Sequence, residues 1–208
     1  MLLWKRIFDF LSALILIPIA SPFLLYFSYR MWREEERPIF YIAPRMKSPT
    51  ETFGLIKFRT MANNSDDGVA TGGDKLSRIT PLGRYLRSRR LDELPQLFNV
   101  LKGDISFVGP RPPLRSYVEA YPELYAEVLK SRPGITGLAT LKFRHREGEI
   151  LSKCTTAKET HETYLRRCIP IKARLDLIYQ RNYRPCLDYW IIYETLSETF
   201  GRKRKRDP

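Results

Sequence analysis

Residues 7–29 read IFDFLSALILIPIASPFLLYFSY, and Asp9 is the single charged residue among these 23 positions. A straight helix of that length would rise about 34 Å, which is enough to cross a bilayer. The segment therefore predicts a helix that associates with a membrane. Its Lys5-Arg6 start is also compatible with a cleaved signal peptide, but nothing downstream resembles a secreted domain.

The path of this helix through a membrane has two alternatives. Pro18 and the pair Ser21-Pro22 lie near its middle, where each proline removes a backbone donor and favours a kink. The Ser21 hydroxyl could satisfy a freed carbonyl there, because lipid offers no water. The distribution of positive charge does not indicate which end of the helix faces the cytoplasm, because basic residues lie on both flanks. Lys5 and Arg6 precede the segment, and the residues that follow it include Arg30, Arg33, Arg37, Arg45 and Lys47. A spanning helix and a re-entrant helix broken at Ser21-Pro22 fit these physical observations equally well.

The whole chain has the size of one compact domain and a strong excess of positive charge. Of its 208 residues, 36 are Lys or Arg and 23 are Asp or Glu, which gives a net charge of +13. Such a surplus indicates an anionic partner: nucleic acid, acidic lipid headgroups or phosphorylated substrates. The cysteines Cys154, Cys168 and Cys186 form no CxxC pair. Neither a disulfide framework nor a zinc site is therefore expected, and the main domain fits a reducing compartment.

The hexapeptide LDELPQ at 91–96 is the centre of the predicted chemistry. Asp92 and Glu93 stand side by side between apolar residues, directly before a helix that Pro95 opens and Gly103 ends. Adjacent side chains point in different directions, so one carboxylate could attack phosphorus while the other holds Mg²⁺. The alternative is structural: the pair caps the helix and forms ion pairs with arginines of the preceding helix.

Several basic residues favour phosphate binding over that structural alternative. They are Lys57 and Arg59 on a predicted strand, Arg87 on a predicted helix, Arg111 in a GPRP loop and Arg132 in an RPG loop. The prolines on both sides of Arg111 restrict its backbone, which helps to fix a guanidinium that clamps phosphate oxygens. Phosphoryl transfer depends above all on positioning and charge neutralisation. The pattern therefore predicts a phosphoryl-transfer site.

Beyond the N-terminal segment we expect an α+β domain that is mainly helical. The sequence predicts a strand at Leu55–Met61, a helix capped by Thr80, and helical structure from 156 to 200. Residues 62–74 are polar and glycine-rich, which is typical of a loop, and 202–206 form a polybasic tail.

These residues closely resemble the bacterial sugar transferase family, the monotopic phosphoglycosyl transferases. The resemblance covers nearly the whole chain and rests on motifs in a fixed order: Lys5-Arg6-x-x-Asp9, Ser21-Pro22, Lys57-Phe58-Arg59-Thr60-Met61, Arg78-Ile79-Thr80-Pro81-Leu82-Gly83, Leu86-Arg87, Leu91–Asp104, Gly109-Pro110-Arg111-Pro112 and Arg132-Pro133-Gly134-Ile135-Thr136-Gly137.

The resemblance implies a monotopic membrane protein. Residues 1–30 would form a re-entrant helix broken at Ser21-Pro22. Residues 31–208 would form a catalytic domain with interfacial helices, on the cytoplasmic face of the bacterial inner membrane. The implied reaction moves a sugar-1-phosphate from a UDP-sugar to polyprenyl (undecaprenyl) phosphate, as the first membrane step of surface glycan synthesis.

The resemblance also implies the roles of the site residues. Asp92 would attack the β-phosphorus with release of UMP, and the lipid phosphate would then take the phosphosugar from Asp92. Glu93 would bind the cofactor Mg²⁺, with Lys57 and Arg111 near the phosphates. Because a carboxyl group with a pKa of about 3.9 is ionised at neutral pH, neither step needs a general base. The expected partners are the UDP-sugar, the polyprenyl phosphate and the bilayer, not nucleic acid, and a homo-oligomer is allowed.

Two stretches depart from the family pattern. Residues 45–49 (RMKSP) replace a glycine-containing turn, and residues 140–144 (TLKFR) replace the usual QVNGR. The second stretch lies in a region that the resemblance links to sugar choice, so no particular sugar is assigned. A non-enzymatic, membrane-anchored basic protein is the rival class. It would explain the charge and the apolar segment, but not the carboxylate pair or the proline-framed Arg111.

Overall fold

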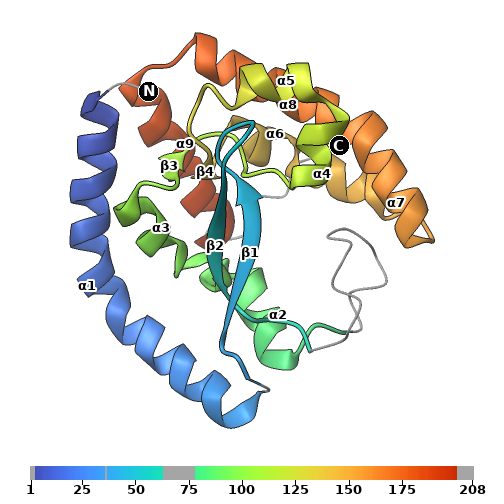
Figure 1. Cartoon of the computed structure of the whole chain (residues 1–208). Helices are drawn as coiled ribbons and strands as arrows, with labels where there is room; N and C mark the ends of the chain where they lie inside the picture. The colour runs from blue at the N-terminus through green and yellow to red at the C-terminus, as the bar shows by residue number, and fades with distance from the viewer. Residues whose placement is uncertain (1–2, 36, 63–77, 201–208) are drawn as a thin grey trace.

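The computed structural model describes residues 3–35, 37–62 and 78–200 of the chain. Within these residues the protein is mainly helical (Figure 1). The elements in chain order are α1 (Leu3–Glu34), β1 (Phe40–Met46), β2 (Thr52–Phe58), α2 (Pro81–Ser88), η2 (Leu91–Glu93), α3 (Gln96–Lys102), β3 (Ser106–Val108), α4 (Arg115–Ala120), α5 (Pro122–Val128), β4 (Gly134–Thr136), α6 (Leu138–Leu151), α7 (Ala157–Thr163), η3 (Tyr164–Cys168), α8 (Ile169–Arg181) and α9 (Pro185–Phe200).

The long first helix, α1, is continuous through Pro18 and Pro22, and its axis bends near its middle (Figure 1). Pro22 has no N–H to donate to the carbonyl of Pro18, four residues earlier. The Ser21 hydroxyl donates to that carbonyl instead, at 2.8 Å, as the sequence predicts. By length and composition α1 can cross a membrane. Whether its path is spanning or re-entrant stays a prediction.

One side of α1 packs against the rest of the protein along its whole length. Its second half contributes Leu24, Phe27 and Met31 to a core with residues of β2, α2 and α3. In its first half, Ala13 packs with residues of the β1–β2 hairpin and α3. The opposite side exposes large apolar residues such as Ile15 and Leu25. This division suits a helix that binds the domain on one side and lipid on the other.

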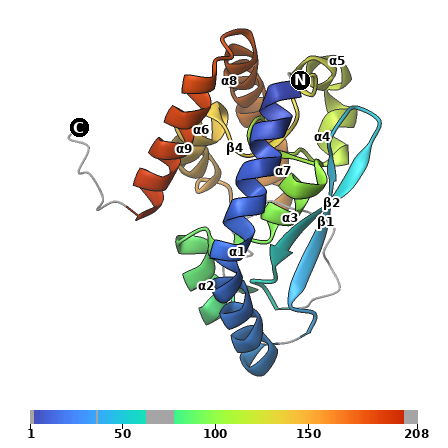
Figure 2. The ribbon, with the colours of Figure 1, turned by 90° about the vertical axis from the view of Figure 1, so that its left-hand side faces the viewer.

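A closed cluster of polar side chains ties the start of α1 to the C-terminal helices. Buried Lys5 forms an ion pair with Asp188 of α9 and donates to the Tyr179 hydroxyl of α8 at 3.3 Å. Tyr179 in turn donates to Asp188 at 2.6 Å. Asp9, 1% exposed, accepts from the backbone N–H of Phe107 at 3.3 Å. These four side chains, Lys5, Asp9, Tyr179 and Asp188, are called the closed cluster below. Figure 2 shows α1 crossing in front of the domain, with α9 beside it.

Two small sheets complete the fold. Strands β1 and β2 form an antiparallel hairpin in which Phe40 pairs with Phe58, and β3 pairs in parallel with β4. The expected strand at Leu55–Met61 overlaps β2 but begins and ends three residues late. Strand β1 was not predicted, because it lies in a mixed stretch whose alternation is interrupted by Pro44.

The helix-start signals are confirmed. Thr80 caps α2, and its hydroxyl accepts from the N–H of Gly83 at 2.9 Å. Pro95 precedes α3, and Gly103 ends it in the left-handed conformation, with φ of 92°. The C-terminal region from α7 to α9 is helical, as expected. Nearly all of the predicted loop at 62–74 and the whole basic tail at 202–206 lie outside the described residues.

Candidate active site

A cavity of about 830 Å³ lies between the β1–β2 hairpin and the helices α6 and α8. Its lining brings together six of the seven residues to which the sequence assigns catalysis or phosphate binding: Lys57, Arg59, Arg87, Asp92, Glu93 and Arg111. These residues come from β2 and the residues that follow it, α2, η2 and the loop after β3. Their convergence supports the prediction of one phosphate-binding site.

The carboxylate pair lies on η2, a short turn between α2 and α3. Arg90, directly before it, adopts the left-handed conformation with φ of 55°, which turns the chain out of α2. On the other side, α3 is fixed to β2 because Asn99, 2% exposed, accepts from Ile56 N–H and donates to the Gly54 carbonyl. The strand that carries Lys57 and the turn that carries the carboxylates are thereby held at a set distance.

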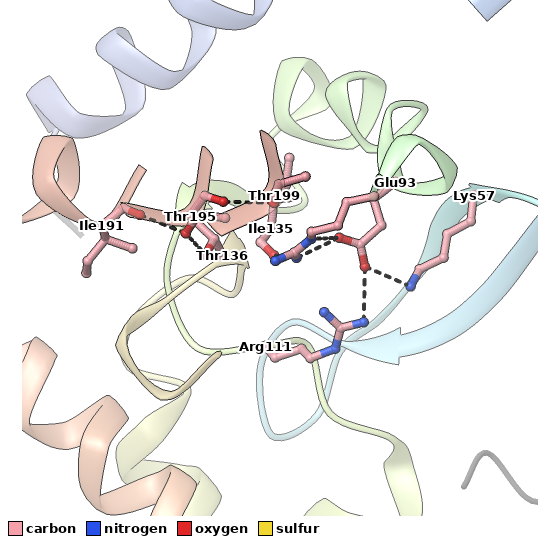
Figure 3. A network of polar contacts seen from close by, with 9 residues as sticks. Lys57, Glu93, Arg111, Ile135, Thr136, Ile191, Thr195 and Thr199 are labelled. Atoms are coloured by element: carbon pink, nitrogen blue, oxygen red, sulfur yellow. Dashed lines mark hydrogen bonds and ion pairs between the residues drawn. The ribbon is translucent and has the colours of Figure 1, made fainter. Parts of the chain in front are cut away.

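Glu93 is the centre of an ion-pair network (Figure 3). Its carboxylate lies 3.4 Å from Lys57 Nζ, 2.8 Å from Arg90 Nη2 and 3.2 Å from Arg111 Nη2. Burial alone would raise the pKa of Glu93, but Arg111, Lys57 and Arg90 together lower that pKa well below its ordinary value. Glu93 is therefore ionised at any physiological pH and holds three cations around the cavity.

Asp92 differs from its neighbour. Within the described ranges, its carboxylate receives no hydrogen bond and forms no ion pair, although it lines the cavity. Partial burial, and then the charge of Glu93, raise the pKa of Asp92, while Lys57, Arg87 and Arg111 oppose that rise. The structural alternative, in which both carboxylates pair with the preceding arginines, thus describes Glu93 in part but not Asp92.

The cations of the site are fixed by different means. Arg87 Nε donates to the Thr60 hydroxyl at 2.7 Å, and Arg59 Nε donates to the Pro38 carbonyl at 3.0 Å. Burial, and then the charge of Arg111, lower the pKa of Lys57 to about 8. Lys57 is therefore mostly protonated at neutral pH but close to losing its proton.

A close contact between two loops fixes the backbone position of Arg111. A Cβ on Gly109 would lie 2.2 Å from the Arg132 carbonyl oxygen, and one on Gly134 would lie 2.2 Å from the Gly109 backbone nitrogen. Only glycine allows the two backbones to approach so closely. The GPRP and RPG loops thus support each other beneath the cavity.

Arg132 is the one predicted site residue that does not line the cavity. It lies on the other side of the loop contact, where its charge interacts with those of Arg6, Asp9 and Asp104. Its Nη1 atom is buried and has no hydrogen-bond partner among the residues that the structure describes. A role for Arg132 in phosphate binding stays a prediction.

On the helical side of the cavity, the sequence indicated only the stretch 140–144, which departs from the family pattern, and the residues that follow it were not predicted. Thr140, Arg144, Glu147 and Leu151 are spaced three or four positions apart along α6, and together with Gly148 they line the cavity. This spacing places them on one face of α6, but a helix that faces water shows the same spacing, so the sequence carried no distinguishing signal. Opposite them, Lys172 of α8 donates to Glu147 at 2.9 Å and to the Tyr164 hydroxyl at 3.0 Å.

The residues present fit a Mg²⁺ ion that shares its coordination with a substrate. No group of three or more His, Cys, Asp or Glu side chains gathers anywhere in the described part of the chain. Mg²⁺, however, commonly binds one or two carboxylates together with substrate phosphates. Asp92 and Glu93 supply such a pair. Because three cations already surround Glu93, the pair needs the added negative charge of a diphosphate before it attracts a metal ion.

Comparisons with known proteins agree with this geometry. The family model described as "Bacterial sugar transferase" matches residues 1–202. The chain is 33% identical over 198 residues, 92% of its length, to an Aeromonas hydrophila UDP-N-acetylgalactosamine-undecaprenyl-phosphate N-acetylgalactosaminephosphotransferase. It is 32% identical over 206 residues, 97% of its length, to a Klebsiella pneumoniae UDP-glucose:undecaprenyl-phosphate glucose-1-phosphate transferase.

The match covers only part of these relatives: 42% of the Aeromonas protein and 41% of the Klebsiella protein. A Bacillus subtilis protein named as an uncharacterized sugar transferase is 39% identical over 141 residues, which are 68% of this chain and 69% of that protein. The family model nevertheless spans the membrane helix, the carboxylate pair and the arginine loops together. The chain therefore belongs to the bacterial sugar transferase family.

Proposed function

We propose that this protein transfers a sugar-1-phosphate from a UDP-sugar to polyprenyl phosphate by way of a covalent phosphosugar on Asp92. The observation that carries the proposal is the contrast within the carboxylate pair. Asp92 lines the cavity with no partner among the described residues, whereas three cations fix Glu93 beside it. A free carboxylate next to clustered cations is the arrangement that a nucleophile for a phosphate group requires.

In the first step, an Asp92 oxygen forms a bond to the β-phosphorus of the UDP-sugar. The bond between that phosphorus and the oxygen bridging to the α-phosphate breaks, and UMP leaves with this oxygen. In the second step, an oxygen of polyprenyl phosphate attacks the same phosphorus and the Asp92–phosphorus bond breaks. Asp92 is restored as a carboxylate, and the lipid carries a diphosphate sugar.

The surrounding residues stabilise the charge that moves in both steps. Arg111 and Lys57 neutralise the phosphate oxygens, and Glu93 keeps these cations in place. Glu93 would hold a Mg²⁺ ion, which would withdraw charge from the diphosphate when bound. Relatives of this chain have names that specify undecaprenyl phosphate as acceptor, which supports a polyprenyl phosphate here.

We also propose that α1 is re-entrant and that the domain faces the cytoplasm at the inner membrane. The bend near the middle of α1 and the Ser21–Pro18 hydrogen bond support this path. A cysteine at position 2, with Cys154, Cys168 and Cys186 replaced by Ala, should resist an impermeant thiol reagent added outside intact cells. Replacing Pro18, Ser21 and Pro22 by Leu, Ala and Leu should straighten α1 and expose that cysteine. Labelling with the unaltered helix would favour a spanning anchor.

The proposed reaction is tested by isolating its intermediate. Purified protein incubated with Mg²⁺ and a UDP-sugar, without lipid acceptor, should gain the mass of one phosphosugar and release an equal amount of UMP. Polyprenyl phosphate should then discharge the adduct. UMP release that occurs only when the acceptor is present, with no adduct at any time, would indicate direct transfer instead. No UMP release from any nucleotide sugar would favour the non-enzymatic rival.

A further inference from the structure

The helical side of the cavity carries groups that the phosphate chemistry does not use. Thr140, Arg144 and Glu147 on α6, Tyr164 on η3, and Lys172 and Asp176 on α8 line this side. We call these six residues the helical wall. The wall lies on α6, η3 and α8, whereas Arg87 lies on α2.

The polar groups of the wall are fixed in place before any ligand binds. The Lys172 ammonium lies 2.9 Å and 3.2 Å from the two oxygens of Glu147 and 3.0 Å from the Tyr164 hydroxyl. The Lys172 and Glu147 side chains are 13% and 24% exposed. The Tyr164 ring packs against Tyr117 with centroids 4.9 Å apart. An array held this rigidly can discriminate between ligands, because its groups do not move to fit the wrong one.

The charge of the wall argues against a phosphate as its ligand. The wall holds the cations Arg144 and Lys172 beside the carboxyl groups of Glu147 and Asp176, and Lys172 is paired with Glu147. It therefore lacks the surplus of cations that surrounds Glu93 and would attract a phosphate oxygen. A carboxylate, an ammonium and a phenol hydroxyl together suit the donors and acceptors of sugar hydroxyls. The wall therefore fits the uncharged, hydroxyl-rich part of a donor better than its diphosphate.

The position of the wall relative to Arg111 identifies that part. Arg111 Nη2 lies 3.2 Å from Glu93, while Glu147 and Tyr164 also act on the charge of Arg111. Arg111 thus lies in the same cavity as both the carboxylate pair and the wall. In a UDP-sugar the sugar is joined to the attacked β-phosphorus through one oxygen, whereas the uridine is separated from it by a second phosphate. A phosphate held by Arg111 at Asp92 brings the sugar within reach of the wall.

We propose that the helical wall binds the sugar of the nucleotide-sugar donor and that Glu147 is the residue by which the enzyme selects among sugars. This inference rests on the proposed function and adds to it a specificity-determining site. Asp176 is less suited to the role, since it receives a hydrogen bond from the backbone of Ala139 at the start of α6. Glu147 faces the cavity from the middle of the same helix.

The test compares Glu147→Ala with Glu149→Ala, an exposed residue on the same helix that does not line the cavity. UMP release would be measured with UDP-glucose, UDP-galactose and their N-acetylamino counterparts. For Glu147→Ala, the ratio of kcat/KM between the best donor and at least one other should change by about tenfold or more, the effect of one lost hydrogen bond to a charged group. Inhibition by UMP, which has no sugar, should change less than about twofold. Glu149→Ala should match the wild type throughout.

A fall in kcat/KM by one common factor for all donors would overturn the inference, and so would a parallel weakening of inhibition by UMP. Tyr164→Phe decides the matter if Glu147→Ala does not fold, because it keeps the ring packing and removes only the hydroxyl bonded to Lys172. It should shift the donor ratios but not the inhibition by UMP. Wild-type protein that releases no UMP from any donor would instead refute the proposed function. In that case, the affinities of UDP-sugars and of UDP, measured by calorimetry, would still test whether the wall binds the sugar.

Discussion

Two groups of charged side chains in this protein both combine a lysine with carboxyl groups but do different things. In the closed cluster, the Lys5 ammonium is directed at Asp188 and Tyr179, and the group joins the first helix to the last two. In the cavity, Lys57, Arg90 and Arg111 all converge on Glu93, and Asp92 stays unpaired among the described residues. The single cation of the closed cluster, Lys5, is already paired with Asp188, whereas the cavity has an excess of cations and a free carboxylate. An active site is thus distinguished from a structural cluster by unpaired charge that faces a cavity, and not by the presence of a buried ion pair.

The sharpest test of this contrast is Asp92→Asn. An amide cannot form the acyl-phosphate, so turnover should fall by at least about a thousandfold, as for other catalytic nucleophiles. Stability should not fall with it. Because burial raises the pKa of Asp92, its ionised form destabilises the folded state at neutral pH, and that cost disappears below its ordinary pKa. The variant should therefore unfold at the wild-type temperature or above it. Retention of a tenth of the activity would mean that the nucleophile is another residue.

Glu93→Gln should reduce both activity and stability. Without the Glu93 carboxylate, three cations lie together without their ion-pair partner. The loss should be about 3 kcal/mol of unfolding free energy and about a hundredfold in kcat/KM. The pKa of Glu93 is lowered from its ordinary 4.5, so its stabilisation is present above pH 4.5 and is lost as the pH falls toward the folded-state value. The stability difference between wild type and variant should shrink on acidification. A difference that is constant from pH 7 to pH 3 would contradict the network.

In the closed cluster the expected effect is on stability rather than chemistry. Lys5→Met leaves Asp188 buried without its cation and should lower stability by about 3 kcal/mol. Lys5→Met combined with Asp188→Asn removes the stranded charge, retains an acceptor for Tyr179, and should recover most of that loss. For the folded protein, kcat should change less than about tenfold. Thermal unfolding and UMP release, measured on the same preparations, separate the two effects. If the double variant is no more stable than Lys5→Met, the lost ion pair is not the cause of the destabilisation.

The smallest effect concerns the proton of Lys57. Its pKa is lowered to about 8, so its ammonium is lost as the pH rises through 8, and with it one cation for the donor phosphates. The value of kcat/KM should fall about twofold at pH 8 and further above it. Lys57→Arg keeps its charge through this range and should flatten the decline. If kcat/KM of Lys57→Arg declines with pH as that of the wild type does, the decline results from the titration of another group.

The sequence predicted best what depends on local signals. Thr80, Pro95 and Gly103 mark the ends of α2 and α3, because caps and proline act within a few residues. Composition and the motif order led to the carboxylate pair and to five basic residues, of which four line the cavity.

What could not be predicted depends on contacts between distant residues. Lys5 and Asp188 are 183 positions apart, and no local pattern links them. Arg132 looked equivalent to Arg111, since both lie in proline-rich loops, yet the backbone contact at Gly109 and Gly134 places the two side chains in different surroundings. The part of the α6 face that follows residue 144 was not predicted, because a helix that lines a cavity has the same periodicity as one that faces water.

The ion pair between Lys5 and Asp188 also has a consequence for the order of events during biosynthesis. Proteins are made from the N-terminus at about 5–20 residues per second, so α1 leaves the ribosome long before its partner on α9 exists. Until residue 188 has been added, the Lys5 charge has no buried counter-ion and stays hydrated at the membrane surface, because a lone ammonium is costly to bury. The apolar part of α1 can enter lipid early, while its final attachment to the domain occurs only after nearly all of the chain has been translated.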